Sequence, residues 1–136
     1  MDIDGLSQIV HLIQMVYAST ITVNQAGWLA MAPEDQMLTI NGVNHVLNEP
    51  DITPEQLHAI WVAAKAENGW RCGNQKCDTQ KTHPCMCQYP SLPIEEQIKP
   101  RLFVAIVNAM APLVDGNNTQ RIPSRIVNNF NIYQNG

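Results

Sequence analysis

Residues 70–93 read WRCGNQKCDTQKTHPCMCQYPSLP and differ in character from the rest of the chain. This segment holds all four cysteines and three of the eight Lys and Arg residues. It is too polar for a helix, and Gly73-Asn74 is a turn signal. Thr82-His83-Pro84 is expected to be extended, because the residue before a proline is pushed out of the α region. The pattern predicts an irregular β-hairpin in which residues 70–72 pair with residues 85–89.

Two helices are predicted before this segment. Apolar residues recur at helical spacing over residues 6–20, where Asp4 is the expected N-cap, and over residues 33–48. The first helix is apolar over much of its circumference, which fits either a core helix or a contact with a second copy. Gly42 lies inside the second helix, where glycine costs about 1 kcal/mol relative to alanine. A close backbone contact would account for that glycine.

Two more helices flank the segment directly. Thr53-Pro54-Glu55-Gln56 is a strong helix start, with a threonine N-cap, proline at the first position and glutamine at the third. On the helix that follows, Lys65 and Glu67 are expected to face outward. The last helix, over about residues 94–113, is apolar on most sides and is expected to be buried nearly all round. Pro100 within it predicts a kink or a restart.

The composition limits the possible classes of function. The chain has 136 residues, the size of one domain, and only 15% of them are charged, against about 25% in an average globular protein. A surface with few solubilising groups favours a homo-oligomer. The net charge of −4 argues against a nucleic-acid binder. Nothing approaches the roughly 20 apolar residues of a membrane span, so we expect a cytoplasmic protein without membrane contact.

The order of residues in the segment and its flanks is typical of one family. The residues that carry this order are Trp61, Gly69-Trp70, Gly73, Lys81-Thr82-His83-Pro84-Cys85, Tyr89, Leu92-Pro93 and Glu95-Glu96. In this order they resemble the RyR domain, the repeat first recognised in the cytosolic part of ryanodine receptors. The domain also occurs singly in bacterial and phage proteins. The resemblance covers residues 51–113, and the preceding residues resemble, more weakly, the leader of phage-type members.

The resemblance implies a fold and a division of the chain. The implied class is α+β, mostly α, with an α-β-β-α module that contains a short irregular β-hairpin and follows two N-terminal helices. Residues 1–50 would be a helical extension packed on the module, residues 51–114 the RyR-like domain, and residues 115–136 an extended or partly disordered tail. The receptor repeats pair with approximate two-fold symmetry, which implies that a single copy forms a dimer or a higher homo-oligomer.

The resemblance also implies a role without catalysis or cofactor. RyR domains of bacteria and phages look like binders of nucleotide-derived signals. A phage-type copy would then sequester such a signal in the cytoplasm of the host cell and so counter a host defence. The alternative is a protein-interaction or structural module with no small ligand, as the repeats are within the receptor.

Aromatic and cationic side chains are the candidates for holding such a ligand. The candidate ligand-binding residues are Trp61, Trp70, Arg71, Lys81, His83, Tyr89 and Arg101. The two tryptophans either pack in the core or form a wall on which a planar base stacks, and the cations would reach a phosphate. His83 could instead make a structural hydrogen bond at the base of the hairpin. The remaining histidines, His58 among them, are expected to lie at the surface or to be satisfied.

The cysteines invite a metal or a catalytic hypothesis. Cys72, Cys77, Cys85 and Cys87, together with His83, supply enough N and S ligands for zinc, but no C-x2-C knuckle is present. We therefore expect free, half-buried thiols and no bound metal. Cys85 lies two residues after His83, so a nucleophile and base are conceivable, but neither an orienting carboxylate nor an oxyanion-hole motif accompanies them. No catalytic residue is predicted.

Overall fold

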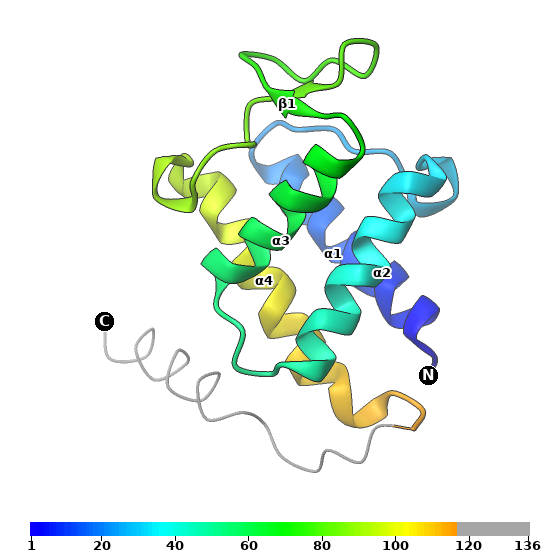
Figure 1. Cartoon of the computed structure of the whole chain (residues 1–136). Coiled ribbons are helices and arrows are strands. Elements are labelled where there is room, and N and C mark those ends of the chain that lie inside the picture. The colour runs from blue at the N-terminus through cyan, green and yellow to red at the C-terminus, as the bar shows by residue number, and fades with distance from the viewer. Residues whose placement is uncertain (117–136) are drawn as a thin grey trace.

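The computed structural model describes residues 1–116, which form a small helical bundle with a short sheet at one end (Figure 1). The helices are α1 (Ile3–Thr20), α2 (Pro33–Asn48), α3 (Pro54–Glu67) and α4 (Ile94–Met110). The strands are β1 (Arg71–Cys72) and β2 (Thr82–His83), and the 3-10 turns are η1 (Trp28–Ala30), η2 (Tyr89–Ser91) and η3 (Ala111–Leu113). The predicted mostly helical α+β class is confirmed. From residue 117 on, the predicted tail lies outside the described residues.

Local capping explains where the helices begin. The Asp2 carboxylate accepts a hydrogen bond from the Gly5 N–H at 2.7 Å, so α1 begins at Ile3 and the prediction of Asp4 as its N-cap is wrong. The predicted capping box of α3 is confirmed. Thr53 Oγ1 accepts from the Gln56 N–H at 3.1 Å, and Gln56 Oε1 accepts from the Thr53 N–H at 2.9 Å.

One hydrophobic core is shared by all four helices. Its buried members are Leu6 and Val10 of α1, Val43 and Val46 of α2, Ile52, Leu57 of α3, Val104 and Val107 of α4, and Val114. Helix α4 contacts each of the other three helices. The two N-terminal helices therefore supply part of the same core as the segment that resembles the RyR domain. None of the described helices has both the length and the apolar character needed to cross a membrane.

Helix α4 differs from its prediction in two respects. It runs without interruption through Pro100, so there is no restart. It is also not buried on nearly all sides, because Ala105 and Ala109 are exposed while Val104 and Val107 are buried. Alanine is apolar yet small, so a face that carries it looks core-like in the sequence but exposes little hydrophobic area to water.

The predicted hairpin is wrong in its pairing. Strand β1 pairs in parallel with β2, with Arg71 opposite Thr82, and Thr82 also forms an antiparallel bridge with Cys77. Residues 85–89 do not form a strand, because the Met86 N–H donates to the His83 carbonyl and closes a turn directly after β2. The chain between β1 and β2 instead folds back on itself as a loop over the end of α3 (Figure 1).

Replacing Gly42 with alanine should lower the free energy of unfolding by about 1 to 3 kcal/mol, although alanine is the better helix former. An added Cβ would lie 2.9 Å from Cζ of Phe103, so α2 and α4 would have to separate or the ring would have to move. Urea unfolding measures the effect. Gly27→Ala is the matched control, because nothing lies within 4 Å of a Cβ there. Equal losses in the two variants would contradict the predicted close contact.

Candidate functional site

Four of the predicted site residues meet where α3, β2 and η2 come together. The Trp61 and His83 ring centroids lie 5.1 Å apart at 80°, and Trp70 lies 6.5 Å from His83. Tyr89 joins through His58, whose ring is 5.7 Å from Trp61 and 6.2 Å from Tyr89. These five residues are referred to below as the aromatic cluster. Four of the residues that the sequence indicated as ligand-binding candidates thus lie in one cluster, although they come from four different parts of the fold.

His58 is the member that sequence reasoning missed as part of the site. It is buried, and its Nε2 forms a hydrogen bond of 2.8 Å with the Cys87 carbonyl. The expectation that it would be satisfied is therefore confirmed. Its position three residues before Trp61 on the same helix face was the signal that could have placed it beside that indole.

Lys65 does not face outward as predicted. Its side chain is only 5% exposed, and Nζ lies 3.1 Å from Asp35 Oδ1 and 4.0 Å from the centroid of the Trp70 ring. The ion pair and the cation–π contact compensate for the loss of water around the ammonium group. Trp70 in turn donates from Nε1 to Glu34 Oε1 at 3.2 Å. The first turn of α2 therefore holds the aromatic cluster through two carboxylates.

This arrangement limits the role of Trp70. The Lys65 ammonium group lies against the face of its indole, and the indole itself is buried. A base that stacked on that face would first have to displace Lys65. Trp61 and Tyr89 are half-buried, so part of each ring remains accessible.

His83 is neutral over the physiological pH range. Burial lowers its pKa from 6.5 to about 4, and the nearby Lys65 charge acts in the same direction. Its Nδ1 accepts a hydrogen bond from the Cys85 backbone N–H at 3.0 Å, which assigns the proton to Nε2. This is the structural hydrogen bond that the sequence suggested as one role for His83.

The sulfur of Cys85 has little nucleophilic character. Burial, and then the Glu96 carboxylate, raise the pKa of its thiol from 9.0 to about 12. The Nδ1 atom of His83 is already engaged with the Cys85 backbone N–H rather than with its sulfur. In this arrangement His83 Nδ1 is not placed to accept the proton of the Cys85 thiol.

The other cysteines are free thiols as well, and Cys72 is exposed. Within residues 1–116, no three His, Cys, Asp or Glu side chains lie close enough together to hold a metal ion. The pKa of the Cys77 thiol is lowered, mainly by a hydrogen bond with the Gln80 backbone and then by one with the Thr79 side chain.

The predicted cations separate into two groups. Arg71 and Lys81 lie on residues 70–83, which we call the loop end, and both are exposed. Lys81 Nζ donates to the Asn68 carbonyl at 2.7 Å. Arg101 lies on α4, where its charge opposes the rise in the pKa of Tyr89 that burial causes. Lys76, which the sequence did not select, adds a third exposed cation to the loop and lies 3.9 Å from Asp78.

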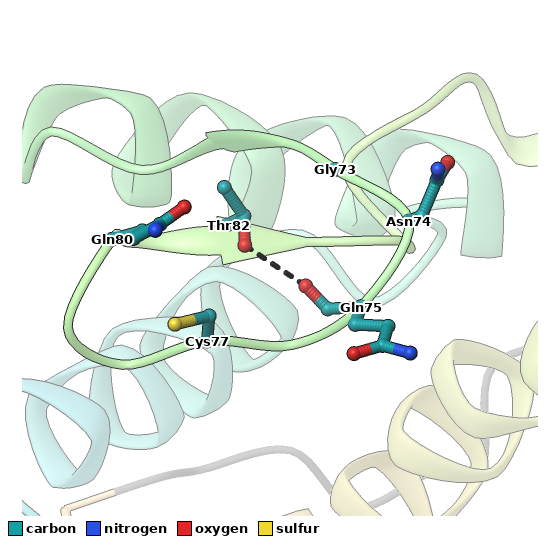
Figure 2. A pocket seen from close by; sticks show the side chains of 6 residues that line it. All are labelled: Gly73, Asn74, Gln75, Cys77, Gln80 and Thr82. Atoms are coloured by element: carbon teal, nitrogen blue, oxygen red, sulfur yellow. Dashed lines mark hydrogen bonds between the residues drawn. The ribbon is translucent and has the colours of Figure 1, made fainter.

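A surface depression of about 560 Å³ lies within the loop itself (Figure 2). It is lined by Gly73, Asn74, Gln75, Cys77, Gln80 and Thr82, and we call it the loop depression. Thr82 Oγ1 donates to the Gln75 carbonyl at 2.9 Å across it. A Cβ on Gly73 would lie 2.7 Å from Cβ of Thr82, so only glycine fits there.

Strand β2 connects this depression to the aromatic cluster. Successive side chains on a strand point to opposite faces, so Thr82 lines the loop depression while His83 packs against Trp61. The cluster is thus a largely buried support on one side of β2, and the depression lies on the other side.

Residues 43–108 match the family model of the RyR domain. The match begins within α2 and ends within α4, so it includes the aromatic cluster and the loop depression. Residues 43–108 therefore form a RyR domain. This is the family that the order of Trp70, His83-Pro84-Cys85 and Tyr89 indicated in the sequence.

Asp35→Asn should destabilise the fold by about 1 to 3 kcal/mol, because it leaves the buried Lys65 ammonium without its counter-charge. This loss is smaller than for a fully buried pair, since Asp35 is 38% exposed. Asp78→Asn is the matched control. This change removes the ion pair between Lys76 and Asp78, whose side chains are 59% and 83% exposed respectively. It should change the free energy of unfolding by less than about 0.5 kcal/mol. Urea unfolding at pH 7 compares the two, and similar losses would refute the role of Lys65.

Because of His83, the free energy of unfolding should decrease as the pH falls below 6.5. Its pKa in the folded chain is about 4, below the ordinary 6.5, so the unfolded chain binds a proton between these values that the folded chain does not. The contribution of neutral, buried His83 to the free energy of unfolding is therefore fully present above pH 6.5 and is lost as the pH falls towards 4. His83→Asn keeps an acceptor for the Cys85 N–H, and its unfolding free energy should fall less between pH 7 and pH 4.5 than that of the wild type. His45→Asn is the control, and an equal fall in the His83 variant would contradict the assignment.

Proposed function

We propose that this chain is a non-enzymatic RyR module that binds a small, nucleotide-derived anion at its loop end. The observation that carries the proposal is the loop depression, which lies on a segment that carries three cations. Lys76 lies between two of its lining residues in sequence, Lys81 lies between two others, and Arg71 is paired with Thr82. A volume of about 560 Å³ is within the range of small-ligand sites, which is about 300 to 1,000 Å³.

The distribution of charge supports an anionic ligand. The chain as a whole has a net charge of −4, and residues 1–64 contain neither lysine nor arginine. Residues 70–83, by contrast, carry three cations and only one acid, Asp78. A positive region on an otherwise acidic protein attracts a compact anion while the rest of the surface repels polyanions such as nucleic acids.

The lining supports a polar ligand that is held by hydrogen bonds. Asn74, Gln75 and Gln80 each carry an amide that can donate and accept, and Thr82 adds a hydroxyl. The aromatic cluster behind β2 would keep these groups in place, which lowers the entropy cost of binding. In this proposal Trp61, Trp70, His83 and Tyr89 act chiefly as the rigid support of the site.

The family resemblance suggests the biological setting. We propose a single-copy phage or bacterial type of RyR protein that sequesters a nucleotide-derived host signal in the cytoplasm, as a homo-oligomer. Sequestration needs binding without turnover. The high pKa of the Cys85 thiol and the engagement of His83 Nδ1 are consistent with such a role.

A protein-interaction module is the second candidate, and the apolar residues at the surface favour it. Leu12 and Val16 on α1 are 59% and 60% exposed, and Leu29 is 94% exposed. Side chains of this size, exposed on a weakly charged protein, are typical of a contact surface. This reading needs no small ligand.

Mass spectrometry of small molecules released on denaturation of the purified protein tests for a co-purified nucleotide. A thermal-shift screen with mononucleotides, cyclic nucleotides, dinucleotides and ADP-ribose complements it. We expect a bound nucleotide or a clear stabilisation by at least one class, and an affinity loss of about tenfold in Arg71→Ala. Arg101→Ala is the matched cation control, because this candidate lies on α4 and does not line the loop depression, and it should bind as the wild type does. A clean spectrum together with no thermal shift for any class would rule out sequestration and favour the interaction module.

A further inference from the structure

A second depression, of about 450 Å³, lies between α2 and the end of α3. Its lining residues are Glu34, Met37, Leu38, Asn41 and Asn68, and we call it the interhelix depression. Four of the five come from α2, outside the residues 51–114 that the sequence indicated as the domain. None of the five belongs to the predicted set of ligand-binding residues.

Lys81 is adjacent to lining residues of both depressions. Its sequence neighbours Gln80 and Thr82 line the loop depression, while its Nζ lies 2.7 Å from the carbonyl of Asn68, which lines the interhelix depression. The backbone of Lys81 has φ of +55°, a conformation that is unfavourable for a residue with a side chain. Strain of this kind persists only where the surrounding structure imposes it, and it occurs often at ligand sites. The exposed Lys81 ammonium group is therefore held at Asn68, which lines the interhelix depression, while the residues beside Lys81 in sequence line the loop depression.

The lining of the interhelix depression suits a flat heterocycle. Met37 and Leu38 are apolar, and Met37 is 59% exposed, so its polarisable thioether is available to an aromatic ring. Asn41 lies one turn further along α2 on the same face. An asparagine amide offers a donor and an acceptor side by side, the pattern that pairs with the N6 and N7 edge of adenine. Asn68 supplies a second amide at the facing helix end.

Glu34 completes the set with an acceptor in a fixed position. Its Oε1 already accepts the Trp70 Nε1–H at 3.2 Å, which orients the carboxylate against the aromatic cluster. A carboxylate can accept several hydrogen bonds, so the remaining lone pairs suit the exocyclic amino group of a base. The same carboxylate would repel a phosphate, which places the anionic part of a ligand towards Lys81 instead.

We propose that the interhelix depression is a base subsite for an adenine-type heterocycle. The phosphate that follows the base lies at Lys81, and the rest of the ligand occupies the loop depression. This subsite rests on the proposed function and deepens it, because it names the ligand as a nucleotide-derived molecule that extends past its first phosphate. In this proposal Asn41 and Met37 distinguish adenine from other bases, and a ligand that carries a base from one that lacks it.

Calorimetric titration with two probes tests the subsite. ADP-ribose carries the base, and ribose 5-phosphate lacks it. Asn41→Ala and Met37→Ala should each weaken ADP-ribose binding about tenfold while leaving ribose 5-phosphate unchanged. Lys81→Met, which keeps the aliphatic stem, should weaken both probes. Asn48→Ala, at the exposed far end of α2, is the matched control and should bind both probes as the wild type does.

The outcomes separate this inference from the function on which it rests. If neither Asn41→Ala nor Met37→Ala alters the binding of ADP-ribose, the base subsite is overturned and the proposed site at the loop depression remains. Equal affinities of the wild type for ADP-ribose and ribose 5-phosphate would have the same consequence. Failure of the wild type to bind either probe would overturn the proposed adenine-type ligand and the subsite together. Thermal unfolding of each unliganded variant shows whether a lost affinity reflects a lost fold.

Discussion

The buried ammonium group of Lys65 is the contact on which the loop end depends. Its charge has left water, so it requires both the Asp35 carboxylate at 3.1 Å and the Trp70 ring at 4.0 Å. Asp35 belongs to α2 and Trp70 to the loop end, so a single side chain of α3 connects the N-terminal helices with the aromatic cluster. The same charge helps to keep His83 neutral. Packing, pairing and protonation at this end of the molecule are therefore coupled through one residue.

This coupling explains why the accessible surface and the rigid support lie on opposite sides of β2. The strand is only two residues long and gains little stability from its own hydrogen bonds. His83 anchors it from within, through Trp61 and the Cys85 N–H, and Thr82 faces the loop depression. A loop held in this way can present several amides and cations to solvent without collapsing on them. That is the physical basis for proposing a ligand site there rather than at the tryptophans themselves.

Much of the fold could be read from the sequence, because its signals are local. The second helix and the capping box at Thr53 depend on neighbours within a few residues, and both were predicted correctly. The order of Trp70, His83-Pro84-Cys85 and Tyr89 identified the family. The hairpin pairing was mispredicted, because alternation in residues 85–89 suggested a strand where a turn after His83 intervenes. Lys65 was misplaced for a related reason, since its partner lies thirty residues earlier in the chain and leaves no trace near position 65.

By itself, the sequence determined the helical class and the family, because periodicity, caps and residue order are properties of short stretches of chain. Only the tertiary structure decided which side chains are buried and which hollows exist. Long-range pairs such as Lys65 with Asp35, and depressions lined from α2 and α3 together, arise when distant segments meet. Their free energy depends on the solvent that the packed helices exclude, and that exclusion is a property of the whole fold.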